Sequence, residues 1–416
     1  MILNDFSRRT FIKLSGVAAA GLGLSACGNS GSASSGSTES AGGAAASGDT
    51  FKVGGIGPVT GPAAIYGSAT KYGAQVAVDE VNAAGKIKLE LNWQDDEHDA
   101  EKSVNAYNNL KDWGMQILVG TTTTTPCVAV STESNADRIF ELTPSASSVN
   151  VLGGEDIGAD NPRKDNVFQM CFTDPNQGTA SAQYISQQKL GTNIAIIYNN
   201  ADAYSTGIYQ KFVDEAGTLG LKIVSTTTFT DDQTDFSVQV GEAKKNKADL
   251  VFLPIYYTPA SLILSEAKKQ DYAPKFFGVD GMDGILDLEG FDKSLAEGVM
   301  LLTPFVATAT DEATQSFDEA YKKASGADAN PNQFAADAYD CVKAIAKAIE
   351  EAKIEPSMAT PDMCDALIKQ FTDASFSYEG LTGKSSWSTT GEVTKTPKGM
   401  VIENGIYMPL DKEETK

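Results

Sequence analysis

The chain has 416 residues, of which 55 are acidic and 33 are basic, and its formal net charge at pH 7 is −22. This acidic balance argues against nucleic acids and anionic lipid surfaces as partners, because proteins that bind them need basic patches. The length is sufficient for two domains, each with a core of its own.

Two export signals stand in series at the N-terminus. Arg8 and Arg9 lie in the sequence Ser-Arg-Arg-Thr-Phe-Ile-Lys, which has the pattern of a twin-arginine signal. The apolar run Leu14–Leu24 is shorter than the roughly 20 residues that span a bilayer, and it leads into Leu-Ser-Ala-Cys, the pattern of a lipoprotein cleavage site. We therefore expect residues 1–26 to be a signal peptide. Cys27 would carry a lipid that anchors the protein at the outer face of the cytoplasmic membrane, in the cell envelope.

The segment after Cys27 consists almost entirely of Gly, Ser, Ala and Thr. Such a composition cannot bury a core and behaves as a flexible coil. Residues 27–49 are therefore predicted to be a tether between the lipid and a folded body. No later segment is apolar enough to span a membrane, so this body is expected to be soluble.

Strands and helices alternate through the first part of the body. Within Ile87–Trp93, for example, apolar residues alternate with polar ones, the period of a half-buried strand. The predicted strands are Phe51–Gly57, Ile87–Trp93, Gln116–Gly120 and Arg138–Leu142, and the predicted helices are Tyr66–Ala84, Ala100–Trp113 and Pro126–Ala136.

The same alternation then repeats. The predicted strands are Val167–Phe172, Asn193–Tyr198, Lys222–Phe229, Leu250–Leu253 and Phe276–Val279, and the predicted helices are Thr179–Lys189, Tyr204–Leu219, Asp235–Asn246 and Pro259–Gln270. Alternating strands and helices predict parallel sheets that are covered by helices.

The last third breaks this pattern. It contains the predicted helices Asp311–Ala324, Asn332–Glu351 and Pro361–Thr372, and then the predicted strands Ser385–Ser388 and Met400–Met408. We therefore predict an α/β fold of two Rossmann-like lobes with parallel-type sheets, joined by a hinge of several chain crossings. The predicted first lobe comprises residues 50–168 and 299–375, and the second comprises residues 169–298 and 376–410.

Ligands of parallel sheets lie beyond the carboxyl ends of the strands, so the loops there are the candidate binding elements. In the first lobe, the loop Thr121–Pro126 offers hydroxyls and a helix start, with Thr125 predicted as the cap and Pro126 as the first helical residue. The loop Thr143–Ser148 adds hydroxyls and backbone donors. Such groups favour an anion, and a small carboxylate is the natural guest.

The second lobe offers groups of the opposite kind. Asp202–Ser205 follows one predicted strand, Tyr256-Tyr257 follows the next, and Asp280-Gly281 follows a third. A carboxylate among aromatic rings suits an ammonium group. One lobe that holds a carboxylate and another that holds an ammonium group would together bind an amino acid.

Catalytic and metal chemistry has little support in the sequence. The one histidine, His98, lies in the acidic segment Asp95–Asp99, which could bind a hard cation but is expected to be a solvated loop. Nucleophilic hydrolysis needs a base beside the nucleophile, and no such arrangement is evident. We expect no metal, no cofactor and no enzymatic activity.

Four cysteines follow Cys27, and their spacings match no zinc site. Disulfides are common in exported proteins, and Cys127–Cys171 and Cys341–Cys364 are the preferred pairings. Buried free thiols are the alternative.

Seven short segments occur in order along Phe51–Met408: Gly61-Pro62 with Tyr66-Gly67, Thr121–Pro126, Thr143–Ser145, Asp174–Gly178, Thr234–Ser237, Tyr256-Tyr257 and Gly278–Gly281. Each alone is a weak signal, whereas all seven behind a lipoprotein signal are a strong one. In these segments the chain resembles the substrate-binding proteins of branched-chain amino acid ABC transporters, which have the type I periplasmic-binding-protein fold.

The resemblance implies roles for individual residues. In relatives a loop serine binds the ligand carboxylate, and Thr124 falls at that position; the threonine run leaves Thr123 or Thr125 as alternatives. The other implied ligand-binding residues are Ser145, Ala146 and Ser147 at the carboxylate, Tyr204 and Asp280 at the ammonium group, and Tyr66 and Tyr256 along the side chain. The tyrosines make a more polar wall than a purely aliphatic pocket, which leaves specificity for Leu, Ile or Val open. Relatives also bind other amino acids, amides, urea and aromatic acids.

The expected function is therefore that of a lipid-anchored, monomeric receptor, exported in the folded state by the twin-arginine route. It would bind a small amino acid, branched-chain in type, between its lobes and deliver it to an ABC transporter permease. An extracytoplasmic sensor, or a hydrolase that uses a loop serine, is the alternative on the same fold.

Overall fold

The computed structural model describes residues 48–154, 161–326, 329–395 and 397–410. The predicted signal peptide with Arg8 and Arg9 lies outside these residues, and so do Cys27 and nearly all of the predicted tether. Among the helices that are described, none is both long enough and apolar enough to cross a membrane.

The first sheet is formed by strands of the part of the chain that begins after Thr50. Its five strands are ordered β2-β1-β3-β4-β5, and every neighbouring pair is parallel. Parallel neighbours must be joined by crossovers, and helices supply them here. The elements are β1 (Phe51–Ile56), α1 (Ala64–Ala84), β2 (Leu89–Gln94), α2 (Ala100–Trp113), β3 (Ile117–Val119), α3 (Thr124–Asp137), β4 (Phe140–Thr143), the 3₁₀ helix η1 (Val149–Val151) and β5 (Val167–Gln169).

The second sheet has the strand order β14-β13-β10-β9-β8-β6-β7. Strands β6 to β10 pair in parallel, whereas β13 pairs antiparallel with β10 and with β14. Successive residues of β6 face opposite core clusters, Ile194 and Ile196 on one side and Ala195 and Ile197 on the other, so both faces of the sheet are covered. Its strands are β6 (Asn193–Asn199), β7 (Lys222–Phe229), β8 (Leu250–Leu253), β9 (Lys275–Gly278), β10 (Met300–Thr303), β13 (Lys398–Glu403) and β14 (Ile406–Pro409).

Four α-helices accompany the second sheet. They are α4 (Asp174–Gln187), α5 (Ala203–Leu219), α6 (Ser237–Lys245) and α7 (Tyr257–Lys269), and the 3₁₀ helices η3 (Asp280–Met282), η4 (Ile285–Asp287) and η5 (Lys293–Ala296) follow β9. The start of α5 has a local cause: Asp202 is its N-cap, and the carboxylate accepts the N–H of Ser205 (3.3 Å).

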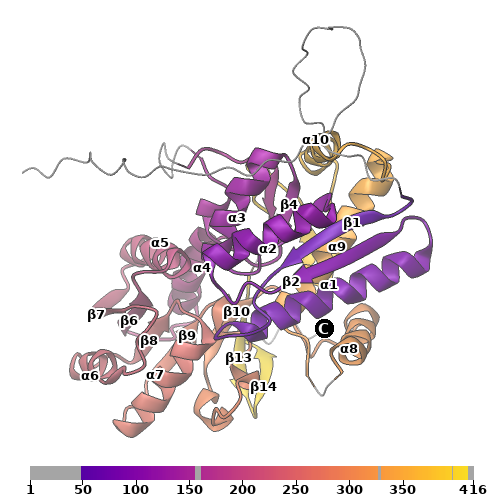
Figure 1. The fold of residues 1–416 in the computed structure, drawn as a ribbon. Coiled ribbons are helices and arrows are strands. Elements are labelled where there is room, and N and C mark those ends of the chain that lie inside the picture. Colours follow the sequence, from indigo (N-terminus) through magenta and orange to yellow (C-terminus); the bar gives the residue numbers. More distant parts are fainter. Residues whose placement is uncertain (1–47, 155–160, 327–328, 396, 411–416) are drawn as a thin grey trace, which may run out of the picture. The chain divides into compact units, whose positions relative to one another are not determined.

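Three helices follow the second run, where the sequence pattern changes: α8 (Glu312–Ser325), α9 (Gln333–Ala352) and α10 (Thr360–Phe371). Helix α9 lies along α1 and also contacts β3, β4 and α10 (Figure 1). It is buried in the same core as Phe140 and Phe168 of the first sheet. A hairpin of β11 (Tyr378–Gly380) and β12 (Gly383–Ser385) follows α10. The predicted α/β class with two sheet domains is confirmed.

The predicted domain boundaries differ from the structure at two places. Strand β10 belongs to the second sheet, where Met300 pairs with Phe277, although the prediction assigns residue 299 onward to the first lobe. Phe376 and Trp387 pack into the core of the first sheet, although the prediction assigns 376–410 to the second lobe. The Trp387 indole N–H donates to the Gln169 carbonyl of β5 (2.9 Å). The chain therefore returns to the second sheet only at β13.

The four cysteines of the body are buried free thiols, so neither Cys127–Cys171 nor Cys341–Cys364 is formed in the structure. The Cys127 thiol donates to the buried carboxylate of Glu141 in β4 (3.3 Å), whereas Cys171 lies beyond the end of β5. Cys341 and Cys364 both pack as apolar side chains in the core that α9 and α10 share. Burial raises the pKa of each of the four thiols, which makes them poor nucleophiles.

Candidate ligand-binding site

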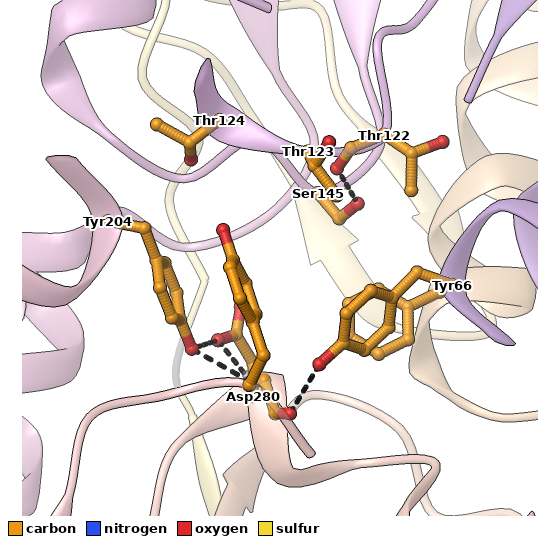
Figure 2. Close-up of a pocket in the computed structure, with 10 residues that line it drawn as sticks. Tyr66, Thr122, Thr123, Thr124, Ser145, Tyr204 and Asp280 are labelled. Carbon is orange, nitrogen blue, oxygen red and sulfur yellow. Dashed lines mark hydrogen bonds between the residues drawn. The ribbon is translucent and has the colours of Figure 1, made fainter. Parts of the chain in front are cut away.

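A pocket lies where loops that follow strands of both sheets come together (Figure 2). The free volume between its walls is only about 10 Å³, roughly what one water molecule needs, so the walls lie close together in this structure. The lining residues are Tyr66, Thr122, Thr123, Thr124, Ser145, Tyr204, Tyr256, Asp280, Gly281 and Phe334. Six of the eight residues predicted to bind a ligand are thus brought together.

The other two predicted residues, Ala146 and Ser147, do not line this pocket. The Ala146 N–H donates to the Thr143 hydroxyl (3.0 Å), and the Ala146 carbonyl accepts from the Gln169 side chain (2.7 Å). The Ser147 carbonyl accepts the N–H of Asp174 (3.0 Å). Both residues therefore connect the loop after β4 to neighbouring elements.

The loop after β3 forms one wall of the pocket through Thr122, Thr123 and Thr124 (Figure 2). The Ser145 hydroxyl donates to the Thr122 carbonyl (2.5 Å), which joins this loop to the loop after β4. The Thr122 hydroxyl lies 2.8 Å from the hydroxyl of Thr70 in α1. These bonds fix the position of the wall before any ligand binds.

Helix α3 begins two residues earlier than predicted. Thr123 is the N-cap, with extended backbone, and Thr124 is the first helical residue, in place of Thr125 and Pro126. The first N–H groups of a helix have no partner within it, and here they belong to Thr124 and Thr125 because proline has none. With the helix dipole, they favour an anion at this wall.

The opposite wall carries a buried carboxylate. Asp280 follows β9 and is 4% exposed. The Tyr204 hydroxyl and the Gly281 N–H donate to the same oxygen of Asp280, at 2.6 and 2.7 Å, and the Asp280 N–H donates to the Gln177 side chain (3.2 Å). Burial raises the pKa of Asp280 to about 6, although the hydrogen bond from Tyr204 opposes that rise. A cation at this wall would stabilise the ionised carboxylate.

Two more buried carboxyl groups lie near Tyr256, which lines the pocket. They belong to Asp174, at the start of α4, and to Asp202, the N-cap of α5. Burial raises the pKa of both, to about 6 for Asp202, and the charges of Asp280 and Asp202 add to the rise at Asp174. The acidic groups near Tyr256 therefore favour a positive group, although the side chain of Thr125 in α3 also hydrogen-bonds Asp202.

Close packing requires glycine after Asp280. A Cβ on Gly281 would lie 2.5 Å from the Tyr204 hydroxyl and 3.0 Å from the Ile255 carbonyl. We therefore expect Gly281→Ala to lower the free energy of unfolding by about 1–3 kcal/mol, the usual cost of overpacking, as measured by denaturant titration. Gly217 in α5 is the matched control: its Cβ would meet nothing within 4 Å, so Gly217→Ala should stabilise the protein by roughly 0.5–1 kcal/mol. Equal stability of Gly281→Ala and the wild type would contradict this geometry.

Aromatic rings complete the pocket. The rings of Tyr204 and Tyr256 stack with centroids 4.7 Å apart and planes 5° apart, and the rings of Tyr66 and Phe334 are 4.5 Å apart. The Tyr66 hydroxyl donates to the Gly281 carbonyl (2.5 Å). Tyr66 belongs to α1, which connects two strands of the first sheet, and Gly281 follows β9 of the second sheet. This bond therefore connects the two sheet domains.

Some lining residues are absent from the sequence prediction. Thr122 and Gly281 adjoin predicted residues in loops that follow strands, and this position in the loops is a signal that predicts them. Phe334 lies at the start of α9, far along the chain from the rest, and no local pattern marks it.

The structure also corrects the expectation for His98. Its ring is partly buried rather than solvated, and Nδ1 lies 2.8 Å from the Thr123 hydroxyl. Within the part of the chain that the structure describes, no cluster of His, Cys, Asp and Glu side chains is suited to hold a metal ion.

The chain is similar to known proteins over most of its length. The chain is 27% identical over 345 residues to "Leu/Ile/Val-binding protein homolog 3" of Brucella melitensis biotype 1, covering 82% of this chain and 88% of that one. It is 26% identical over 308 residues to the "Leucine-, isoleucine-, valine-, threonine-, and alanine-binding protein" of Pseudomonas aeruginosa, covering 73% and 79% of the two chains.

Among solved structures, it is similar to the branched-chain amino acid transporter substrate binding protein LivJ from Streptococcus pneumoniae in complex with isoleucine. The TM-score is 0.75, the identity is 25%, and the match covers 86% of this chain and 97% of that one. Residues 50–401 match the family model described as "Periplasmic binding protein". The chain therefore belongs to the periplasmic binding protein family and has its type I fold.

Proposed function

We propose that this protein is an extracytoplasmic receptor, anchored by a lipid on Cys27, that binds a small amino acid and delivers it to the permease of an ABC transporter. We propose a branched-chain amino acid as the ligand. The observation that carries the proposal is the opposite chemistry of the two pocket walls, with the start of α3 on one and buried Asp280 on the other. A free amino acid has a carboxylate and an ammonium group on one carbon and so matches both walls.

The ligand carboxylate would bind at the start of α3. The N–H groups of Thr124 and Thr125 and the Thr124 hydroxyl are its donors in this proposal. The Ser145 hydroxyl donates to the Thr122 carbonyl, and it can rotate toward a carboxylate because hydrogen bonds to an ionised acceptor are stronger than those to a neutral one.

The ligand ammonium group would bind at Asp280. Burial, which raises the pKa of this carboxyl to about 6, is offset when a cation pairs with it. Tyr204 and Tyr256 both line the pocket, and an aromatic face that is not covered by the stack would add an attraction for a cation. Among the described residues, no lysine or arginine contributes to the pKa of Asp280, so the ligand would supply the positive charge.

The side chain of the ligand would lie against aromatic rings. Tyr66, Tyr256 and Phe334 line the pocket, and their rings favour a compact apolar group beside them. The two relatives from Brucella melitensis and Pseudomonas aeruginosa are named as binding proteins for leucine, isoleucine and valine, whose side chains are compact and apolar. Together these observations support an aliphatic amino acid.

The hydrolase alternative has less support. A serine nucleophile needs a general base within hydrogen-bond reach. The Ser145 hydroxyl donates to a carbonyl, and the one histidine of the chain contacts Thr123 instead. The relatives named above are solute-binding proteins rather than enzymes.

A thermal-unfolding screen tests the ligand class. A ligand that binds only the folded protein stabilises it by about 2.7 kcal/mol at a hundred times its Kd. We expect leucine, isoleucine or valine at millimolar concentration to raise the Tm, and glutamate and lysine to leave it unchanged. No change with any amino acid, together with a clear rise for another class of solute such as benzoate, would contradict the proposal.

The anchor is testable separately, because it depends on the N-terminal signals alone. We expect Cys27→Ser to move the exported protein from the membrane fraction to the soluble extracytoplasmic fraction, since the lipid site is lost. Arg8→Lys combined with Arg9→Lys should retain the protein inside the cell. Cell fractionation with immunoblotting measures both outcomes. A Cys27→Ser protein that stays in the membrane fraction would argue against lipid anchoring.

A further inference from the structure

His98 lies beside the pocket without lining it. Its Nδ1 is 2.8 Å from the hydroxyl of Thr123, the N-cap of α3. Its ring meets the ring of Tyr256 edge to face, with centroids 5.6 Å apart and planes 86° apart. His98 follows β2 of the first sheet, whereas Tyr256 follows β8 of the second. One imidazole therefore contacts both walls.

The turn that presents this imidazole is held in an unusual conformation. Glu97 and His98 have φ angles of 50° and 63°, in the left-handed region that side-chain-bearing residues seldom adopt. The Asp95 carboxylate accepts the N–H of Glu97 (3.0 Å), and the Asp96 carboxylate accepts the N–H of His98 (3.0 Å). The Ser103 hydroxyl, in α2, donates to Asp96 (3.2 Å). Two carboxylates thus hold a strained turn that aims His98 at the pocket wall.

The partners of His98 connect to both ends of the proposed ligand. Thr123 directly precedes the N–H groups that would bind the carboxylate. Tyr256 stacks on Tyr204, whose hydroxyl donates to Asp280 at the ammonium end (2.6 Å). A displacement of His98 would therefore loosen both ends at once.

We propose that His98 is a positioning residue, which holds the start of α3 and the Tyr256–Tyr204 stack in the arrangement that grips an amino acid. This inference rests on the proposed function and adds to it a specific residue that does not line the pocket. The imidazole acts through Thr123 and Tyr256, and it makes no contact with the ligand itself.

The electrostatic surroundings of His98 favour a neutral ring when the walls meet. Burial lowers the pKa of His98 from its ordinary value of 6.5, and the charges of Asp231, after β7, and Asp99, in the same turn, oppose that change. The groups that α3 and the segment before α7 present to the ring, Thr123 and Tyr256, are uncharged at neutral pH. Closure of the walls around a ligand should therefore lower the pKa of the imidazole and release its proton.

Because the chain has one histidine, a single imidazole signal reports on this contact. The experiment is a pH titration by NMR of tag-free protein labelled with [¹⁵N]histidine, first without ligand and then saturated with isoleucine. We expect saturation with isoleucine to lower the pKa of the imidazole measurably, by up to about one pH unit, because closure desolvates the ring.

Calorimetry with isoleucine at pH 8 tests the positioning role in variants. We expect His98→Ala to weaken binding about three- to tenfold, the typical worth of one hydrogen bond, and His98→Gln to restore part of the loss. The loss caused by His98→Ala should shrink in a Thr123→Val background, because the same contact is already missing. Glu97→Gln is the matched control, since this side chain is exposed in the same turn and pairs only with Lys102 among the described residues. It should bind as the wild type does.

Thermal unfolding of each variant without ligand shows whether it is folded. If His98→Ala does not fold, the NMR titration of the wild-type protein still tests the inference. If the wild type binds isoleucine while the imidazole pKa stays fixed and His98→Ala binds equally well, this inference is overturned and the proposed function survives. If the wild type binds no amino acid, the proposed function fails and the inference fails with it.

Discussion

Asp280→Asn should reduce the affinity of the protein for its amino acid by about 2–3 kcal/mol, a factor of roughly 30–150. The substitution keeps the shape of the side chain but removes the negative charge that would pair with the ligand ammonium group. Asp280 is 4% exposed, so water screens that charge little. Isothermal titration calorimetry with isoleucine at pH 8 measures the loss.

A matched control separates this local effect from the net charge. Asp271 is exposed in the turn after α7, and Asn tolerates its left-handed φ of 51°, so Asp271→Asn should leave the affinity unchanged. The pH dependence provides a second check. Since the pKa of Asp280 is raised to about 6, protons compete with the ammonium group as the pH falls through 6, and the wild-type affinity should fall there. In Asp280→Asn it should fall less steeply. If Asp280→Asn binds isoleucine at pH 8 as tightly as the wild type does, the ammonium group binds elsewhere.

Lys395→Met should lower the free energy of unfolding by about 3–5 kcal/mol, the cost of leaving a buried charge without its partner. The Lys395 ammonium group lies 2.6 Å from the carboxylate of Asp337 in α9, and the two side chains are 1% and 2% exposed. Lys395 belongs to the segment that leads from the first sheet's core to β13. The ion pair therefore joins α9 to a crossing of the chain between the sheets. Chemical denaturation measures the loss.

The partner substitution shows whether charge is the cause. Asp337→Asn added to Lys395→Met should recover part of the lost stability, because Asp337 is then no longer a charge without its partner. Burial raises the pKa of Asp340 and the charge of Lys395 opposes that rise, so this buried carboxyl still lacks that cation in the double variant. Lys86→Met is the control: Lys86 and Glu350 form an ion pair whose side chains are 70% and 36% exposed, so its loss should cost only about 0.5 kcal/mol. If Lys395→Met lowers the free energy of unfolding by no more than the control does, the buried ion pair has no special role in stability.

Features that depend on local sequence could be predicted. The alternation of apolar strands and helices determines the two sheets, and the rule that ligands lie beyond parallel strands directs attention to Asp280 and to the threonine run. The register within that run is harder. Five identical side chains carry no information on where α3 begins, and the helix starts at Thr124 rather than at Pro126.

Features that depend on contacts between distant segments could not be predicted. Phe334 reaches the pocket because α9 packs along α1, and His98 reaches Tyr256 because two separate sheets meet. Nor does resemblance to a family show what a residue does. In the segment Thr234–Ser237, Phe236 is buried in the core and the Asp235 carboxylate accepts the N–H of Ser237 (2.8 Å), so the segment serves the fold rather than the pocket.

The central claim is that opposite walls of one pocket bind the two charged groups of a single amino acid. Calorimetry with leucine and two of its analogues tests it most directly. Leucine amide lacks the carboxylate, and 4-methylpentanoate lacks the ammonium group, while both keep the side chain. The account predicts that leucine binds and that each analogue binds at least about 30-fold more weakly, since each leaves one buried wall unpaired. Binding of either analogue as tightly as leucine would contradict it.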